Sequence, residues 1–390
     1  MMQDLNKRIA LSIDPGYDGT KTTVNGVTFT IPHDTVEKRG KEYDSCRDLE
    51  DIYQIETAAG TYLLGPGISA LIGENDELHE RFGKATMQSN NYSYFSTNEF
   101  YANTMASIAI GLIKAAEENL CDLNNIDPKN TYYIVELPHS ALETSGRVVY
   151  EALVKKHHIV ISGKISGTYK TYELDFEIPK NKLIIGSQAI ACLIGYTTDE
   201  NGTEIDNLKD CYPVLLNDNG YYTSAKFVIS RTHAISGAES KLDYGMMEIH
   251  QKVADKINKE YGTSYKGYDM REIFNERDGM ITVSHRISKS GNNETYDIKP
   301  TLDKVTREVF HAYMNELDEE LDSLTKIKLN LFGGGTGEIF YKIFMEEYAE
   351  KYSNLKAELV TYEHNGHIVT PRESISMGGY KLLLSQIGAK

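Results

Sequence analysis

The stretch best suited to chemistry lies near the carboxyl end, where a short apolar run meets three glycines. Leu329-Asn330-Leu331-Phe332 leads into Gly333-Gly334-Gly335-Thr336-Gly337, and an amphipathic stretch follows over residues 338–352. This pattern predicts a strand, a tight turn and a helix. Glycines let the backbone pass close to a flat or charged ligand, and the N–H groups at a helix start can bind phosphate. A purely structural turn is an equal alternative for this stretch alone.

A second candidate site lies at the amino end. The apolar strand predicted over residues 8–13 delivers Asp14-Pro15-Gly16-Tyr17-Asp18-Gly19-Thr20-Lys21, and a β-type run follows over 22–31 with a turn at Asn25-Gly26. A carboxylate is a hard oxygen ligand for Mg²⁺, while backbone N–H groups and a lysine ammonium can neutralise phosphate oxygens. The segment therefore predicts a magnesium–phosphate site, although a solvated hairpin is the structural alternative. It is not a Walker loop, because no helix follows Lys21.

A third segment repeats this arrangement in the middle of the chain. A strand predicted over 212–217 leads into Asp218-Asn219-Gly220-Tyr221-Tyr222, and another strand follows over 225–230. The order strand, Asp-x-Gly, strand therefore occurs twice. It predicts two similar halves, each presenting an Asp-bearing hairpin to a shared cleft.

The composition limits the classes of function. The chain has 390 residues, enough for two domains, and its formal net charge of −16 argues against a dedicated nucleic-acid surface. Lys155-Lys156-His157-His158 is the densest basic segment, and we interpret it as a solvated helix end. The cysteines (Cys46, Cys121, Cys192 and Cys211) have no paired spacing, which predicts neither a disulfide framework nor a metal site and favours the cytoplasm. No signal peptide and no apolar run of about 18 residues is present, so we expect no membrane contact.

Other periodic segments supply the elements that must position these motifs. Hydrophobic periodicity predicts helices over 98–120, 145–156, 187–196, 240–261, 302–324 and 377–387. It predicts strands over 131–137, 158–165, 169–178 and 182–185, with a weak hairpin over 52–64.

The order of these motifs resembles that of the actin/hexokinase/heat-shock chaperone ATPase superfamily, and within it the bacterial actin-like plasmid-partition proteins of the ParM group. Residues 14–21 are similar to the first phosphate motif, Asp218-Asn219-Gly220 to the second, and residues 332–337 to the adenosine motif. Gly186-Ser187-Gln188-Ala189 and Met377-Gly378-Gly379 are similar to the two connecting-helix segments, and Glu136-Leu137-Pro138 to a strand end ahead of a helix. Tyr221-Tyr222 departs from the pattern, because relatives have a glycine- or acid-rich continuation there.

The resemblance implies an α/β, actin-like fold. Two similar RNase H-like lobes would each carry a smaller inserted subdomain, with a nucleotide in the cleft between them. We expect the first lobe over 1–186 with an insertion at about 32–96, and the second over 187–370 with an insertion at about 237–305. Residues 371–390 would form a C-terminal helix that returns to the first lobe.

The resemblance also implies roles for individual residues. Gln188, Asp218 and Asp14 are expected to be catalytic: Gln188 would orient the attacking water, and the two aspartates would hold Mg²⁺ through water. ATP is the expected nucleotide, with GTP left open. The expected nucleotide-binding residues are Gly16, Tyr17, Asp18, Gly19, Thr20, Lys21, Asn219, Gly220, Tyr221, Gly333, Gly334, Gly335 and Thr336.

The function that the resemblance implies is an ATPase that polymerises with nucleotide into dynamic filaments. Its partners would be further copies of itself and a DNA-bound adaptor. The filament would move plasmid DNA through this adaptor and would itself contact neither nucleic acid nor membrane. The alternatives are a small-metabolite kinase on the same fold and a chromosomally used bacterial cytoskeletal filament. A kinase needs a carboxylate for the acceptor hydroxyl, and the sequence offers no convincing motif for one. A membrane-linked division protein is disfavoured because neither terminus is predicted as an amphipathic helix.

Overall fold

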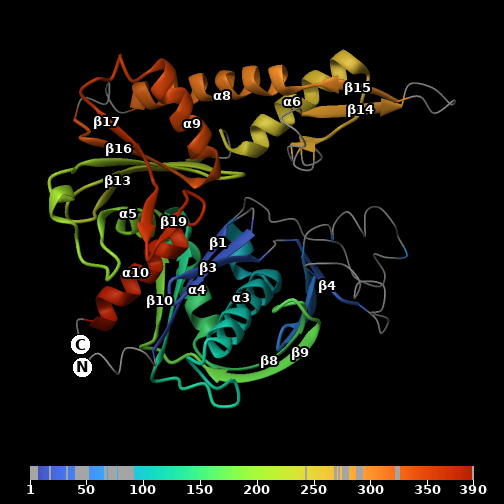
Figure 1. The fold of residues 1–390 in the computed structure, drawn as a ribbon, viewed down its shortest axis with the longest axis vertical. Coiled ribbons are helices and arrows are strands. Elements are labelled where there is room, and N and C mark those ends of the chain that lie inside the picture. Colours follow the sequence, from blue (N-terminus) through green and yellow to red (C-terminus); the bar gives the residue numbers. More distant parts are fainter. Residues whose placement is uncertain are drawn as a thin grey trace. The chain divides into compact units, whose positions relative to one another are not determined.

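The computed structural model describes residues 8–16, 19–31, 34–39, 52–65, 68, 77, 92–241, 244–267, 270, 273–274, 281–286, 293–320 and 326–388. The chain forms two compact units (Figure 1). Unit 1 comprises Met1–Asp210 and Val360–Lys390, and unit 2 comprises Cys211–Leu359. Each unit is described by itself below.

A five-stranded sheet forms the centre of unit 1, with the strand order β10-β7-β1-β2-β3. β10, β7 and β1 are parallel, whereas β1, β2 and β3 form an antiparallel meander. The turn between β2 and β3 is formed by Asn25 and Gly26 at φ 47° and 89°, as a tight hairpin turn requires. The strands are β1 (Ile9–Gly16), β2 (Gly19–Val24), β3 (Val27–Ile31), β7 (Thr131–Leu137) and β10 (Leu183–Ser187). The predicted strands at 8–13, 22–31, 131–137 and 182–185 are confirmed within a few residues at their ends.

A second, antiparallel sheet of unit 1 has the order β4-β6-β5-β8-β9. The helix α3 (Asn98–Glu117) contacts both sheets of the unit and lies against the curved sheet that contains β8 (Figure 1). This position explains why α3 is buried on nearly every side rather than along the single predicted stripe. It follows the short 3-10 helix η3 (Tyr92–Ser96). The strands are β4 (Thr35–Glu37), β5 (Tyr53–Thr57), β6 (Gly60–Leu64), β8 (Lys156–Gly163) and β9 (Lys170–Glu177).

The predicted insertion at 32–96 is described only in part. The hairpin predicted over 52–64 is confirmed as β5 and β6, while residues 40–51 and most of 66–91 lie outside the described residues.

The described part of unit 1 also contains the helices α4 (His139–Leu153), α5 (Gln188–Thr197) and α10 (Ser374–Gly388). The prediction that α4 begins at residue 145 was wrong. The helix starts directly after Pro138, and its buried face already includes Ala141. The basic segment Lys155-Lys156-His157-His158 is not a helix end, because β8 begins at Lys156. The remaining elements are η4 (Asp206–Leu208), β18 (Tyr362–His364) and β19 (His367–Val369).

The sheet of unit 2 repeats the arrangement of the first sheet. Its order is β13-β12-β11-β16-β17, with β11, β16 and β17 parallel and β11, β12 and β13 antiparallel. A central strand that continues into an antiparallel meander on one side and parallel strands on the other therefore occurs in both units. The predicted similarity of the two halves is confirmed at the level of sheet topology. The strands are β11 (Val214–Asn219), β12 (Ser224–Ile229), β13 (Ile235–Lys241), β16 (Leu329–Gly333) and β17 (Lys356–Leu359).

Three helices of unit 2, α6 (Met246–Tyr261), α8 (Lys299–Glu320) and α9 (Gly334–Glu347), form its hydrophobic core together with the sheet. The predicted helix over 240–261 was too long, because its first residues belong to the strand β13, which pairs with β12. A two-stranded hairpin, β14 (Thr282–Arg286) and β15 (Asn293–Asp297), lies within the predicted second insertion. In the part of the chain that the structure describes, none of the helices has the length and apolar character needed to cross a membrane.

Candidate functional site

The first phosphate-type motif forms the end of the β1–β2 hairpin in unit 1. The strand register places Asp14 opposite Lys21 and Gly16 opposite Gly19, and the two residues between them, Tyr17 and Asp18, lie outside the described residues. A Cβ atom on Gly16 would lie 2.9 Å from Lys21 Nζ. A glycine at this position therefore lets the lysine ammonium fold over the hairpin end beside Asp14.

Gln188 is brought to the same place from far along the chain. It is the first residue of α5, directly after β10, and its Nε2 donates a hydrogen bond of 2.8 Å to Asp14 Oδ1. The Asp14 carboxylate is only 3% exposed. Burial raises its pKa to about 6, although the Lys21 ammonium and the Gln188 hydrogen bond both act to lower it. The structure thus joins two of the three residues that the sequence predicted as catalytic.

A second buried carboxylate, Glu136, lies on β7 next to this group. Ser12 Oγ donates a 2.7 Å hydrogen bond to Glu136 Oε1, whereas Oε2 has no hydrogen-bond partner among the described residues. Burial raises the pKa of Glu136 well above its ordinary value of 4.5, and the nearby Asp14 charge adds to this effect. No catalytic or binding role is predicted for Glu136 from the sequence. A charged residue inside an otherwise apolar strand was the signal that could have found it.

Gly379 on α10 makes this carboxylate's position possible. A Cβ atom there would lie 1.5 Å from Glu136 Oε1 and 2.5 Å from Ser12 Oγ. The second connecting-helix motif therefore packs its glycine directly on the buried carboxylate.

Thr20, also a predicted nucleotide-binding residue, has its hydroxyl engaged elsewhere. The Thr20 side chain is fully buried and Oγ1 donates to Asn103 Oδ1 of α3 at 2.5 Å. This hydroxyl ties the hairpin to α3.

In unit 2 the second phosphate-type motif meets the glycine-rich segment. Asp218 lies opposite Gly333 in the parallel pairing of β11 with β16. Thr336 Oγ1 donates a 2.7 Å hydrogen bond to the carbonyl oxygen of Gly220, which joins the two motifs directly. The Asn219 amide nitrogen Nδ2 is buried without a hydrogen-bond partner among the described residues. Asp218, Asn219, Gly220, Gly333, Gly334, Gly335 and Thr336 are thereby gathered at one end of this sheet.

The helix α9 begins earlier than predicted. The sequence indicated a turn over 333–337 followed by a helix from 338, but β16 extends to Gly333 and α9 starts at Gly334. Gly334 has φ +73°, and a Cβ atom there would lie 2.3 Å from the carbonyl oxygen of Asn219 and 3.0 Å from Asp218 Oδ1. The strand therefore passes into the helix at Gly333 and Gly334, and Gly334 lies beside the Asp218 carboxylate.

Tyr221 and Tyr222, the departure from the family pattern, pack on one another with ring centroids 5.0 Å apart. The Tyr221 hydroxyl lies 3.3 Å from His250 Nδ1 on α6, and the backbone N–H of Met247 donates to the Tyr221 carbonyl oxygen at 2.7 Å. Tyr221 is thus anchored to α6 through both its side chain and its backbone.

Among the described residues, one group of three metal-ligating side chains comes together outside these motifs. His158, Glu173 and Asp175 project from β8 and β9, and all three are exposed. His158 Nδ1 lies 3.0 Å from Asp175 Oδ1, so these groups form a surface hydrogen bond.

No protein-family model matches the sequence, and no curated protein matches it. Solved structures of bacterial and archaeal actin homologues match nearly the whole chain. A 15-stranded ParM filament from Clostridium botulinum is 14% identical, with 97% of this chain and 99% of that chain covered and a TM-score of 0.62. ParM from Bacillus thuringiensis with ADP is 12% identical, with 98% and 99% covered and a TM-score of 0.60. An archaeal actin homologue in complex with ADP is 13% identical, with 97% and 99% covered and a TM-score of 0.58.

The identities are low, so the likeness concerns the fold. The strand order of both units and the match over nearly the whole chain indicate the same fold. The prediction of fold class is confirmed. This chain has the actin-like fold of the ParM proteins and other bacterial and archaeal actin homologues.

Proposed function

We propose that this protein is an ATPase that polymerises with nucleotide into dynamic filaments and moves plasmid DNA through a DNA-bound adaptor in the cytoplasm. The observation that carries the proposal is the presence of all three nucleotide-type motifs at sheet ends of an actin-like fold. The similar structures include a ParM filament and two ADP complexes, which supports both self-assembly and nucleotide binding. The net charge of −16 favours an adaptor over direct contact with DNA. The lobe boundaries at 186/187 and 370/371 belong to the same proposal.

Two features of unit 2 suit a nucleotide. Gly334 packs closely on the Asn219 carbonyl, which brings the glycine-rich turn against the Asp218-Asn219-Gly220 motif, and the buried Asn219 Nδ2 is a hydrogen-bond donor without a partner among the described residues. The first turn of α9 adds backbone N–H groups and the positive end of a helix dipole. In the proposal, this end of the sheet holds the nucleotide through Asn219, Gly220 and the backbone of residues 333–336.

In the proposal, the hairpin of unit 1 is a phosphate-binding element. Lys21 Nζ is folded close to Gly16, where its charge can neutralise phosphate oxygens. Gly16 and Gly19 allow the close packing of the hairpin end, and Tyr17 and Asp18 complete the loop in the proposal. Hard carboxylate oxygens at Asp14 and Asp218 fit a hydrated Mg²⁺, which supplies charge neutralisation of the β- and γ-phosphates when bound.

Hydrolysis of the terminal phosphate needs a positioned water more than a strong base, because the transition state is loose. Gln188 is suited to this task. Its Nε2 is held by Asp14, which fixes the side chain and leaves the amide oxygen to accept a hydrogen bond from the attacking water. Asp14 is thus proposed to orient Gln188 as well as the water shell of the metal.

The proposal is tested by right-angle light scattering with parallel phosphate release on the purified chain, followed by negative-stain imaging of the same sample. We expect scattering to rise when Mg-ATP is added, to decay as phosphate appears, and to coincide with filaments. GTP in place of ATP tests the nucleotide preference. Unchanged scattering with ATP and GTP over a broad protein concentration range would refute filament assembly. Phosphate release without assembly would instead direct the search to an acceptor substrate and a kinase.

A further inference from the structure

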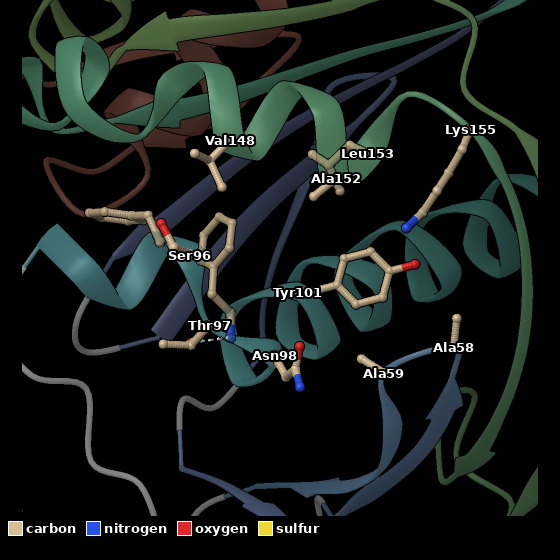
Figure 2. A pocket seen from close by; sticks show the side chains of 12 residues that line it. Ala58, Ala59, Ser96, Thr97, Asn98, Tyr101, Val148, Ala152, Leu153 and Lys155 are labelled. Atoms are coloured by element: carbon tan, nitrogen blue, oxygen red, sulfur yellow. Dashed lines mark hydrogen bonds between the residues drawn. The ribbon is translucent and has the colours of Figure 1, made fainter.

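Unit 1 contains a cavity of about 270 Å³ that is separate from every residue proposed for nucleotide binding. Its walls come from the turn between β5 and β6, the end of η3 with the first turn of α3, and the last turns of α4 (Figure 2). An apolar cavity of about 150 Å³ can hold one benzene molecule. This cavity therefore has room for a ring system together with a polar group.

Three of the twelve residues that line the cavity are aromatic, and these three are held in fixed positions. Phe95 and Phe100 are 2% and 3% exposed and meet edge to face with ring centroids 5.3 Å apart. The hydroxyl of Tyr101 is engaged by His157 Nδ1 at 2.9 Å, and His157 Nε2 lies 2.7 Å from the carbonyl oxygen of Leu153. Because its hydroxyl is hydrogen-bonded to His157, Tyr101 lines the cavity with its ring rather than with a polar group (Figure 2). A preformed apolar wall of this kind favours a flat ligand.

The charge of the cavity is positive, although the chain as a whole is strongly acidic. Among the described residues that line it, Lys155 is the charged one, and no carboxylate is among them. The Lys155 ammonium lies 5.0 Å from the centroid of the Tyr101 ring, so it stands at the edge of the aromatic wall. The polar side chains of Thr97 and Asn98 lie at the start of α3, where the helix dipole also favours a negative group.

We propose that this cavity binds a small aromatic carboxylate, with its ring among Phe95, Phe100 and Tyr101 and its carboxylate at Lys155. Such a ligand would touch the β5–β6 turn, α3 and α4 at the same time. Binding would therefore stabilise the packing of the β5–β6 hairpin on the two helices. The proposal does not depend on nucleotide binding or filament assembly.

The test uses 2-naphthoate as the probe, titrated calorimetrically into the full chain without nucleotide. We expect saturable binding at one site. Lys155→Gln should weaken binding about fivefold or more, because it removes the cation but keeps most of the side chain's length. Lys156→Gln is the matched control: it removes the same charge from the neighbouring exposed position, which does not line the cavity, and should change affinity less than twofold.

A filling variant gives a second, independent readout. Ala152 is half-buried on α4 and lines the cavity, so Ala152→Phe should abolish binding while Lys156→Gln does not. Amide hydrogen exchange should slow over residues 57–60 when 2-naphthoate is bound to the wild-type chain. The proposal is overturned if the wild-type chain shows no saturable binding, if Lys155→Gln and Lys156→Gln weaken binding equally, or if a folded Ala152→Phe variant binds like the wild type. Equal binding of the neutral 2-naphthamide would also refute the role of Lys155.

Discussion

The hydrogen bond between Gln188 and Asp14 connects residues from two parts of the chain that sequence alone can pair only through a family resemblance. Asp14 ends a strand, and Gln188 begins a helix after another strand of the same sheet. Gln188→Ala removes the amide that would orient the attacking water and leaves the proposed phosphate-binding groups in place. We expect hydrolysis to fall about 100-fold, with nucleotide affinity changed less than about threefold. Gln386→Ala, on the exposed side of α10, is the control and should hydrolyse ATP like the wild type. Equal losses in the two variants would contradict the role.

Gly334 allows a second test at the residue scale, because the chain provides a matched glycine. Gly334 has φ +73° and Gly366 has φ +81°, so alanine strains the backbone at both positions. A Cβ atom at Gly366 meets nothing within 4 Å, whereas at Gly334 it would overlap the carbonyl of Asn219. We expect Gly334→Ala to lower the free energy of unfolding by about 2 kcal/mol more than Gly366→Ala, and to abolish nucleotide binding. Urea unfolding and nucleotide titration measure both effects; similar costs in the two variants would rule out the steric argument.

The residues that carry the site were predictable to different degrees. Asp14, Asp218 and the glycines stand out because each sits at the end of an apolar run, where a loop must begin. Glu136 did not stand out as a functional residue. Its burial results from the pairing of β7 with β1 and from the close approach of Gly379 on α10, which are tertiary contacts. Likewise, only the folded chain shows that the Thr20 hydroxyl is committed to Asn103.

At the scale of elements, the errors of prediction follow from packing. The bounds of the strand 131–137 were predicted correctly, since it is a mostly apolar run that is buried on both faces. The start of α4 was missed because the residues after Pro138 are mostly polar, and the helix is fixed there by Ala141 in the core. The last two residues of β13, Ser240 and Lys241, were predicted as the start of a helix, but they pair with β12 as a strand. The intrinsic preference for helix or strand is weak in such segments, so pairing with a neighbouring strand decides which structure forms.

Lys381 connects two helices and leads to a prediction of pH dependence. Its ammonium, 1% exposed, donates 2.8 Å hydrogen bonds to the carbonyl oxygens of Gly195 and Thr198 at the end of α5. Burial lowers the pKa of Lys381 from the ordinary 10.5 to about 8. The unfolded chain therefore holds more protons between these two values, and the free energy of unfolding should rise with pH in that window.

The free energy of unfolding of the wild type, minus that of a Lys381→Met variant, should increase by on the order of 2 kcal/mol between pH 7.5 and pH 9.5. Urea unfolding of both proteins at several pH values measures this difference. Lys342→Met, at an exposed position of α9, should parallel the wild type over the whole range. A wild-type advantage that stays constant or falls with pH would contradict the lowered pKa.

At the scale of the whole molecule, the repeated sheet is the feature that the sequence indicated and the structure confirms. Two Asp-x-Gly hairpins predicted two similar halves, and both sheets place the hairpin on the central strand. Identities of 12% to 15% with the similar structures show how little side-chain identity this topology requires. What must be retained among proteins of this fold is the pattern of apolar and polar residues along each strand and helix. Filament geometry cannot be predicted in this way, because it depends on the complementarity of exposed surfaces.

The last prediction concerns the assembled protein. If nucleotide binding drives assembly and hydrolysis drives disassembly, a variant that binds but does not hydrolyse should form filaments that persist. Asp218→Ala is expected to stop phosphate release because it removes a proposed anchor of the metal's water shell. Assembly should stay partly intact, because the other proposed nucleotide-binding groups, Asn219, Gly220 and the first turn of α9, are unchanged. Light scattering after Mg-ATP addition should therefore reach a plateau in Asp218→Ala and decay in the wild type. Asp206→Ala removes an exposed carboxylate of the other unit and should decay normally. Normal phosphate release by Asp218→Ala would show that Asp218 is not catalytic. A scattering plateau in both Asp218→Ala and Asp206→Ala would show that filament lifetime does not depend on hydrolysis.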